Sequence, residues 1–335
     1  MSTNQTAKNP VPIPDEKKDQ LRKLTKVPSI AWPTIFLLFW IVGGVVTTDI
    51  LALQGVIPLW VAAVLNVVWM YPVFHVGHDA LHRAVSSNRK LNDWAGRIAL
   101  FFTVPEVALS SFRYAHMIHH RYTNADQDPD HYIFGSNWAT TVLRWMTFEF
   151  NYAYLCMKAD TPAGKKAFRV AVPAVLATVA VFSTLCVLGY WQEAIFLWLI
   201  PSRITLGLIA FVFLWMPHLS DDRGSGLSHI HAADSSLDNL TAGTTMRLGN
   251  EWLLAPLTQW HNYHLIHHLW PTTPSYRHAR VWKLLEPELR ERDLNIQHGF
   301  SLKPTFHPAG TTAVSDYGSH LKSIFHPAAT NAVGH

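Results

Sequence analysis

The chain has 335 residues and is 15% charged, well below the roughly 25% of typical soluble domains, although its hydrophobic fraction of 49% is ordinary. Its 14 tryptophans and 20 histidines are many for this length. The composition excludes a disordered chain, a collagen and a coiled coil. Cys156 and Cys186 form no C-x-x-C pair, which excludes a disulfide framework and a cysteine zinc cluster.

The N-terminal segment, residues 1–28, is polar and basic. It lacks the apolar core and the small-residue cleavage site of a secretory signal. We therefore expect this segment to stay in the cytoplasm.

Four apolar stretches follow, each near the roughly 20 residues that a helix needs to cross a bilayer. They cover about 30–53, 56–76, 170–188 and 194–215. A few residues around Gln54 and Gly55 separate the first two, and the short segment 189–193 joins the last two. We therefore predict four transmembrane helices arranged as two hairpins.

The basic residues indicate how these helices are oriented. Neither hairpin tip contains Lys or Arg, and apart from Arg203 in the fourth stretch all 27 Lys and Arg lie in the other segments. By the positive-inside rule, both termini and the region between the hairpins are then cytoplasmic, and we expect a protein of the bacterial inner membrane. Arg203, close to Pro201, indicates either a functional side chain that faces the protein interior or a break in this span.

One further apolar stretch, residues 94–112, is interrupted by an arginine, a proline and a glutamate. We interpret it as an interfacial or re-entrant segment. We assign residues 29–295 to a single membrane domain and residues 296–335, rich in Gly, Ser, Thr and Pro, to a flexible tail. The predicted fold class is an all-α membrane protein.

Eight histidines fall into three clusters outside the hairpin tips. They are His78 and His82, then His116, His119 and His120, and finally His264, His267 and His268. Spacings of three or four residues place imidazoles on one face of a helix. At this histidine content roughly 0.07 chance matches to H-x-x-H-H are expected in the chain, whereas two occur. The clusters therefore predict metal binding.

All three clusters can meet at one site, because the second hairpin crosses the membrane twice and returns the chain to the same side. We therefore expect a helical cytoplasmic cap that carries the metal site. Imidazole without thiolate suits iron, copper or zinc, and eight nitrogens are more than one ion uses, which predicts a pair of metals. Redox chemistry with oxygen favours iron. The alternative from another class, a membrane metal-binding or transport protein, would need ligands at mid-membrane on a path between both faces.

Other polar residues near the clusters are candidates for supporting roles. The candidates for an additional metal ligand are His75, His218 and His261. A metal-bound imidazole usually donates its other N–H to a carboxylate or carbonyl group. The candidates for that acceptor role are Asp79, Asn124, Asp128 and Asn262.

At these clusters the chain resembles the integral-membrane fatty acid desaturase superfamily, over most of residues 60–290. The residues around the second and third clusters, 113–131 and 262–271, are similar to the branch that includes bacterial β-carotene hydroxylase-like proteins. Fatty-acid-modifying relatives, including alkene-forming decarboxylases, share much of this pattern. The resemblance implies that the eight clustered histidines bind two iron ions and that molecular oxygen is a co-substrate.

The resemblance also implies hydrogen abstraction from an unactivated C–H bond of a fatty acyl chain, with desaturation, hydroxylation or oxidative decarboxylation to a terminal alkene as outcomes. A carotenoid β-ring hydroxylase is the alternative. The sequence contains no G-x-G-x-x-G that opens a βαβ unit and no cysteine cluster, so electrons must come from another protein. We expect a lipid substrate, a ferredoxin or similar carrier with a separate reductase, and no nucleic-acid partner. The formal net charge of +4 suits an acidic carrier.

Overall fold

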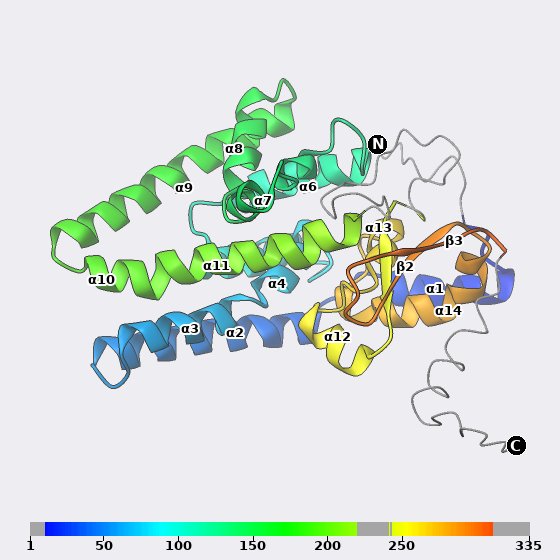
Figure 1. The fold of residues 1–335 in the computed structure, drawn as a ribbon, viewed down its shortest axis with the longest axis horizontal. Helices are drawn as coiled ribbons and strands as arrows, with labels where there is room; N and C mark the ends of the chain where they lie inside the picture. Colours follow the sequence, from blue (N-terminus) through cyan, green and yellow to red (C-terminus); the bar gives the residue numbers. More distant parts are fainter. Residues whose placement is uncertain (1–10, 220–240, 242, 311–335) are drawn as a thin grey trace, which may run out of the picture.

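The computed structural model describes residues 11–219, 241 and 243–310. In chain order its elements are α1 (Asp15–Thr25), α2 (Trp32–Leu53), α3 (Leu59–Met70), α4 (Val73–Leu81), α5 (Arg89–Thr103), α6 (Leu109–Tyr122), η2 (Pro129–Ile133), α7 (Trp138–Trp145), α8 (Phe148–Lys158), α9 (Pro162–Val187), α10 (Trp191–Glu193), η3 (Ala194–Leu199), α11 (Ile200–Ile209), η4 (Ala210–Trp215), η5 (Met216–His218), β1 (Thr245–Leu248), α12 (Glu251–Leu257), α13 (His264–Leu269), η6 (Ser275–Arg277), α14 (His278–Arg290), β2 (Leu294–His298) and β3 (Thr305–His307). Helices dominate the molecule (Figure 1), which confirms the expected fold class. Most of the predicted tail, beyond residue 310, lies outside the described residues, as do residues 1–10.

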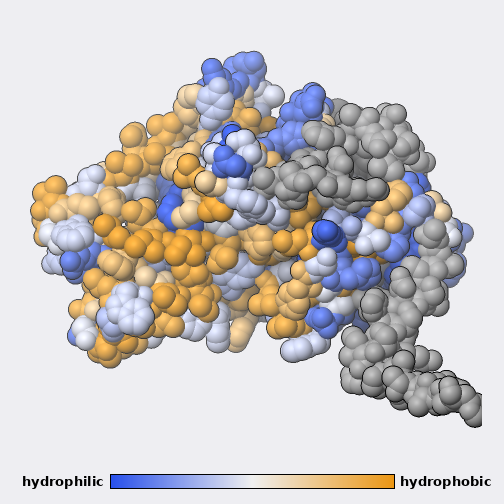
Figure 2. Space-filling model, viewed as in Figure 1, coloured by the Kyte–Doolittle hydropathy of each residue, from blue (hydrophilic) through white to orange (hydrophobic). Residues whose placement is uncertain are grey.

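Among the described residues, four helical stretches are long and apolar enough to cross a membrane. They are Trp32–Leu53, Leu59–Leu81, Pro162–Val187 and Trp191–His218. Large apolar side chains cover their outward faces. For example, Phe36 is 73% exposed and Val187 is 87% exposed. Figure 2 shows the hydrophobic surface gathered over this half of the molecule. A bilayer would remove this apolar surface from water, as the sequence predicts.

The first hairpin pairs α2 with α3. Gly55, at a φ of 72°, forms the turn between them, a left-handed conformation that glycine adopts without steric cost. Pro72 then separates α3 from α4, because proline cannot donate the backbone hydrogen bond that would continue the helix. α4 therefore leaves the hairpin at an angle and carries the first histidine cluster into the cap (Figure 1).

The second hairpin is longer than the apolar stretches that predict it. α9 begins at Pro162, eight residues before the expected start at 170, where the Thr161 side chain accepts a hydrogen bond from the Gly164 N–H. The first turns of α9 are basic, so they were not part of an apolar pattern. The charge pattern thus indicates the membrane edge and not the start of the helix. The fourth stretch contains two π-helical segments, η3 and η4, and η3 ends two residues before Pro201.

The apolar stretch 94–112 is divided between two helices, and the break between them lies around Pro105. Asn88 caps α5 by accepting hydrogen bonds from the N–H groups of Lys90 and Leu91. α5 ends before Pro105, and α6 begins at Leu109. α5 packs along α4. It therefore buttresses the helix that carries the first histidine cluster.

Arg203 faces the protein interior on an unbroken part of α11, which excludes the interpretation of a broken span at this residue. Its guanidinium donates to the carboxylates of Glu106, in the connection between α5 and α6, and of Glu149 on α8. It also donates to the Met146 carbonyl, at 3.2 Å. The Arg203 side chain is 17% exposed and that of Glu149 is 3% exposed. Arg203 therefore connects the fourth span to two elements of the central region.

Replacing Arg203 by methionine is expected to destabilise the protein by about 3–5 kcal/mol, because two buried carboxylates lose their cation. The midpoint of thermal unfolding in detergent should fall clearly. Arg97→Met, on the exposed face of α5, is the matched control and should change the midpoint little. Replacing both Glu106 and Glu149 by glutamine in the Arg203→Met background should recover part of the loss. An unchanged midpoint for Arg203→Met would contradict the structural role.

A small sheet, which the sequence pattern does not predict, organises the cap. β1 pairs in parallel with β2, and β2 pairs in antiparallel fashion with β3. Arg247 on β1 donates to the carbonyls of Gly299 and Ser301, in the connection from β2 to β3. The apolar side of the sheet packs with α1, α13 and α14 in a core separate from that of the spans. The sheet extends past residue 295, the predicted end of the membrane domain.

Candidate metal centre

Three helices bring the eight clustered histidines to one place. α4 contains His78, and His82 directly follows its last residue. The second half of α6 contains the second cluster, and the short α13 contains the third. α4 contacts α6 directly. The residue before α13, Tyr263, pairs with Met246 of β1, which anchors this short helix to the sheet. All eight side chains are buried except that of His120, which is half-buried.

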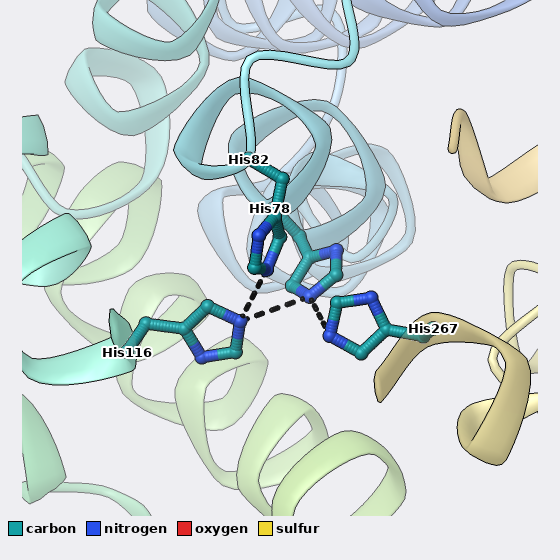
Figure 3. A group of neighbouring side chains, drawn as sticks. All are labelled: His78, His82, His116 and His267. Atoms are coloured by element: carbon teal, nitrogen blue, oxygen red, sulfur yellow. Dashed lines mark hydrogen bonds between the residues drawn. The ribbon is translucent and has the colours of Figure 1, made fainter. Parts of the chain in front are cut away.

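One group of four imidazoles contains His78, His82, His116 and His267. Their ligand atoms all lie within 4.8 Å of one another. The Nε2 atom of His78 is 3.1 Å from that of His267 and 3.2 Å from that of His116. The Nε2 atoms of His116 and His82 are 2.8 Å apart. Figure 3 shows the four rings, from α4, α6 and α13, directed toward a common centre.

A second group of four contains His119, His218, His264 and His268, again within 4.8 Å. The Nε2 atom of His264 is 3.0 Å from those of both His218 and His268. His120 lies between the groups, with its Nε2 atom 2.8 Å from that of His267. The eight clustered histidines and His218 thus form two adjacent sets of nitrogen donors.

The converging imidazole nitrogens need a partner for their lone pairs. A neutral imidazole presents one N–H and one lone pair, so several Nε2 atoms that converge in a buried space cannot all satisfy one another by hydrogen bonds. A cation between them satisfies every lone pair at once. The donor set therefore fits a pair of metal ions bound by histidine.

Of the three candidates for an additional ligand, the structure brings only His218 into a group of donors. His75 instead lies 3.2 Å from the Thr34 hydroxyl through its Nε2 atom. His261 packs its ring against that of His78, at 4.4 Å between centroids, without joining either group of converging nitrogens. His218 ends the fourth span, and the chain carries it into the second group through η5.

Two of the four predicted acceptors contact the histidine groups. The Asp128 carboxylate lies 2.9 Å from Nδ1 of His119, and the Asn124 side-chain oxygen lies 3.0 Å from Nδ1 of His218. Asn124 has a φ of 62°, a left-handed conformation that asparagine tolerates. Both contacts turn Nε2 of the histidine toward the centre and fix the tautomer.

The other two acceptors support the surrounding fold. Asp79 accepts hydrogen bonds from the hydroxyl groups of Thr34, at 3.0 Å, and Ser275, at 2.6 Å, and so ties α4 to the first span and to η6. Asn262 donates to the Arg247 carbonyl at 3.2 Å and holds the chain before α13 against β1. Neither contacts a histidine of the two groups.

Two residues near the second group are not among the four predicted acceptors. The Asp130 carboxylate lies 3.4 Å from Nδ1 of His119, and the Tyr152 hydroxyl of α8 donates to Asp130 at 2.5 Å. The alternation of Asp126, Asp128 and Asp130 was a signal for Asp130. Tyr152 carries no such signal, because only the folded chain brings α8 beside this loop.

The electrostatics of the site favour uncharged imidazoles. Burial lowers the pKa, and neighbouring histidines lower it further, for His82, His116, His120, His264, His267 and His268. Burial acts in the same direction on His119, but the carboxylates of Asp128 and Asp130 outweigh it and raise the pKa of His119 to about 9. Those six imidazoles therefore keep the lone pairs that a metal requires, whereas His119 must release its proton before it can bind one.

Two known proteins are similar to this chain. A β-carotene ketolase of Paracoccus sp. (strain PC1) is 27% identical over 255 residues, which cover 74% of this chain and 89% of the ketolase. An omega-3 fatty acid desaturase of Caenorhabditis elegans is 22% identical over 249 residues, which cover 66% of this chain and 60% of the desaturase. The chain thus spans less than two thirds of that desaturase.

The profile of one protein family, described as fatty acid desaturase, matches residues 54–300. The match includes the three histidine clusters, both histidine groups and three of the four apolar helical stretches. By this match the chain belongs to the fatty acid desaturase family.

Proposed function

We propose that the protein is an oxygen-dependent membrane oxidase with two iron ions. The observation that carries the proposal is the pair of adjacent groups of buried imidazoles with converging Nε2 atoms. The proposed ligands are His78, His82, His116, His119, His120, His264, His267 and His268, together with His218. Cys156 and Cys186 lie in neither group, so the donor set is free of thiolate and suits iron. Membership of an oxidoreductase family supports the redox assignment.

When bound, the two ions would supply the reduction of molecular oxygen and the removal of hydrogen from an unactivated C–H bond. The chain itself holds the donors in place: Asp128 and Asn124 orient His119 and His218 through their Nδ1 atoms. Burial of the ligands excludes bulk water, which protects a reactive centre from side reactions. The protein's role is therefore to position the metals and the substrate, and the metals carry the difficult chemistry.

The proposed substrate is a fatty acyl chain, supported by the family match and by the position of the metal centre next to the apolar helices. Desaturation, hydroxylation and oxidative decarboxylation to a terminal alkene all begin with the removal of one hydrogen. They differ in what happens to the carbon that loses it. Where the chain is held relative to the metals decides the outcome.

A second candidate is oxidation of a carotenoid ring. It is favoured by the similarity to a β-carotene ketolase, of which the match covers 89%. Expression in a host without carotenoids, and in the same host supplied with β-carotene, separates the two candidates. New unsaturated, hydroxylated or decarboxylated acyl products in the first host support the acyl reaction. Oxidised carotenoid in the second host, with unchanged acyl lipids in both hosts, would instead support the carotenoid reaction and contradict the acyl reaction.

We also propose that the metal centre and both termini face the cytoplasm of a bacterial inner membrane. The hairpin tips lie at one end of the spans, and α13, which carries the third histidine cluster, lies at the other (Figure 1). The absence of Lys and Arg from both tips supports this orientation by the positive-inside rule. A ferredoxin or similar carrier, with its reductase, would then deliver electrons from the cytoplasmic side.

Replacing Asp128 by asparagine is expected to weaken iron affinity about 10–100-fold, as the loss of partners to metal-bound histidines generally does. The negative charge that fixes His119 disappears, whereas the shape of the side chain is kept. Titration of the metal-free protein with ferrous iron, followed anaerobically, measures this affinity. Asp126→Asn, an exposed neighbour on the same loop, is the control and should bind iron as the unmodified protein does. Equal affinities for both variants would contradict the role of Asp128.

A further inference from the structure

An open cleft lies on the cap between α12, the end of β1 and α14. It encloses about 690 Å³, and its walls include the tryptophans Trp252, Trp260 and Trp282. Trp252 stands at the rim and is 80% exposed, whereas Trp260 is half-buried. The metal centre described above does not use this cleft.

Trp260 has an unusual backbone conformation. Its φ is 63°, and that of the preceding Gln259 is 50°, a left-handed region that bulky residues rarely adopt. The Gln259 side chain accepts a hydrogen bond from the His75 N–H at 2.8 Å and donates to the Tyr71 carbonyl at 3.1 Å. The Trp260 N–H donates to the Ala255 carbonyl at 2.7 Å. Strain of this kind persists where the surroundings hold it, and such residues cluster at functional sites.

Trp260 lies one peptide bond away from a histidine that packs against the metal centre. Its ring meets that of His75 edge to face, with 5.6 Å between centroids. The next residue, His261, packs its ring 4.4 Å from that of His78 and 5.5 Å from that of His267. His78 and His267 are proposed metal ligands. A single residue, His261, therefore separates the tryptophan in the cleft from the first histidine group.

Resting on the proposed function, we propose that electrons enter the metal centre at Trp260, from an acidic one-electron carrier protein that docks in this cleft. In each encounter the reduced carrier loses one electron and one ferric ion becomes ferrous, with no bond formed or broken. Two encounters reduce the pair. The held conformation of Trp260 keeps its ring between the docked carrier and the histidines.

Charge on the α14 wall fits an acidic partner. Lys283 lines the cleft together with Arg290, Glu251 and Glu286, and Arg280 lies just outside this lining, one helical turn before Lys283 on the same exposed face. In the part of the chain that the structure describes, no carboxylate forms an ion pair with either side chain, whereas Arg290 in the same wall pairs with Glu286. Complementary charges steer the encounter of two proteins and raise its rate.

The first test follows the reduction of the iron-loaded protein by stopped-flow spectroscopy without oxygen. The reductant is either a reduced [2Fe–2S] ferredoxin or dithionite. Trp260→Gly removes the ring at a backbone position that glycine adopts without strain. We expect it to slow reduction by ferredoxin about ten-fold or more, with dithionite unaffected and with partial recovery in Trp260→Phe. Trp94→Ala, an exposed tryptophan of α5 outside the cleft, is the control.

The second test measures binding of oxidised ferredoxin to the metal-free protein in lipid nanodiscs, so it needs no activity. Exchanging both Arg280 and Lys283 for glutamate is expected to weaken binding about ten-fold at low ionic strength, with a smaller difference at high salt. Lys158→Glu on α8 is the matched control. Displacement of ferredoxin by phosphatidylglycerol vesicles would assign the cleft to lipid headgroups and overturn the proposal.

The two proposals fail in different ways. If the protein binds no iron after reconstitution, the proposed function is contradicted. An iron-loaded Trp260→Gly variant that ferredoxin reduces as fast as the unmodified protein overturns the entry point alone.

Discussion

Replacing His267 by alanine is expected to abolish oxygen-dependent turnover, with a loss larger than the roughly 10–100-fold typical of changes outside the ligand set. His267 belongs to the first histidine group and also lies with His120 and His268 between the groups. Its loss therefore removes a donor at the point where the two groups meet. Turnover and bound iron per chain, measured on the same preparation, report the effect.

His298→Ala is the matched control for this variant. His298 is an exposed residue at the end of β2, outside both histidine groups. The control should keep the iron content and turnover of the unmodified protein. Circular dichroism shows whether His267→Ala keeps its helices. A folded His267→Ala variant with normal iron and normal turnover would contradict the metal assignment.

Replacing His218 by alanine is expected to remove one iron and leave the other. The second group would keep three imidazoles, whereas the first group, around His78 and His116, would remain complete. Iron should fall from about two to about one per chain, and turnover should be lost because the reaction needs both ions. An isolated ferric ion also gives an electron paramagnetic resonance signal that a coupled ferric pair lacks.

Two outcomes of the His218 experiment would contradict its role as a ligand. One is an unchanged iron content with unchanged turnover. The other is loss of both irons together with loss of helical structure, which would make His218 a structural residue. The His298→Ala control serves here too, because it removes an imidazole without touching either group.

The membrane architecture follows from the sequence because burial in lipid leaves a simple pattern of uncharged stretches and charged ends. That pattern indicates the spans, but it places the start of α9 late, since the basic first turns of the helix look like a loop. It also misses the small sheet, because strands of three to five residues such as β1 and β3 carry little periodicity of their own.

The eight clustered histidines stand out in the sequence because ligands on one face of a helix are only three or four residues apart. The sequence does not distinguish His218 from His75 and His261 as an additional ligand. Only the fold shows that His218, at the end of the fourth span, reaches the second group and that the other two join neither group. Tyr152 lies far along the chain from the residue that it contacts, and no spacing rule links the two. The same holds for the contact of Trp260 with His75, which depends on a left-handed turn that the sequence does not predict.

The most direct test of this account is the iron content of the protein. The chain should be purified from its membrane, reconstituted without oxygen with ferrous iron, and freed of loosely bound metal. We predict two irons per chain, with the spectroscopic signature of a coupled pair after oxidation. Fewer than two irons per chain, or preferential retention of zinc at the same sites, would contradict the di-iron assignment.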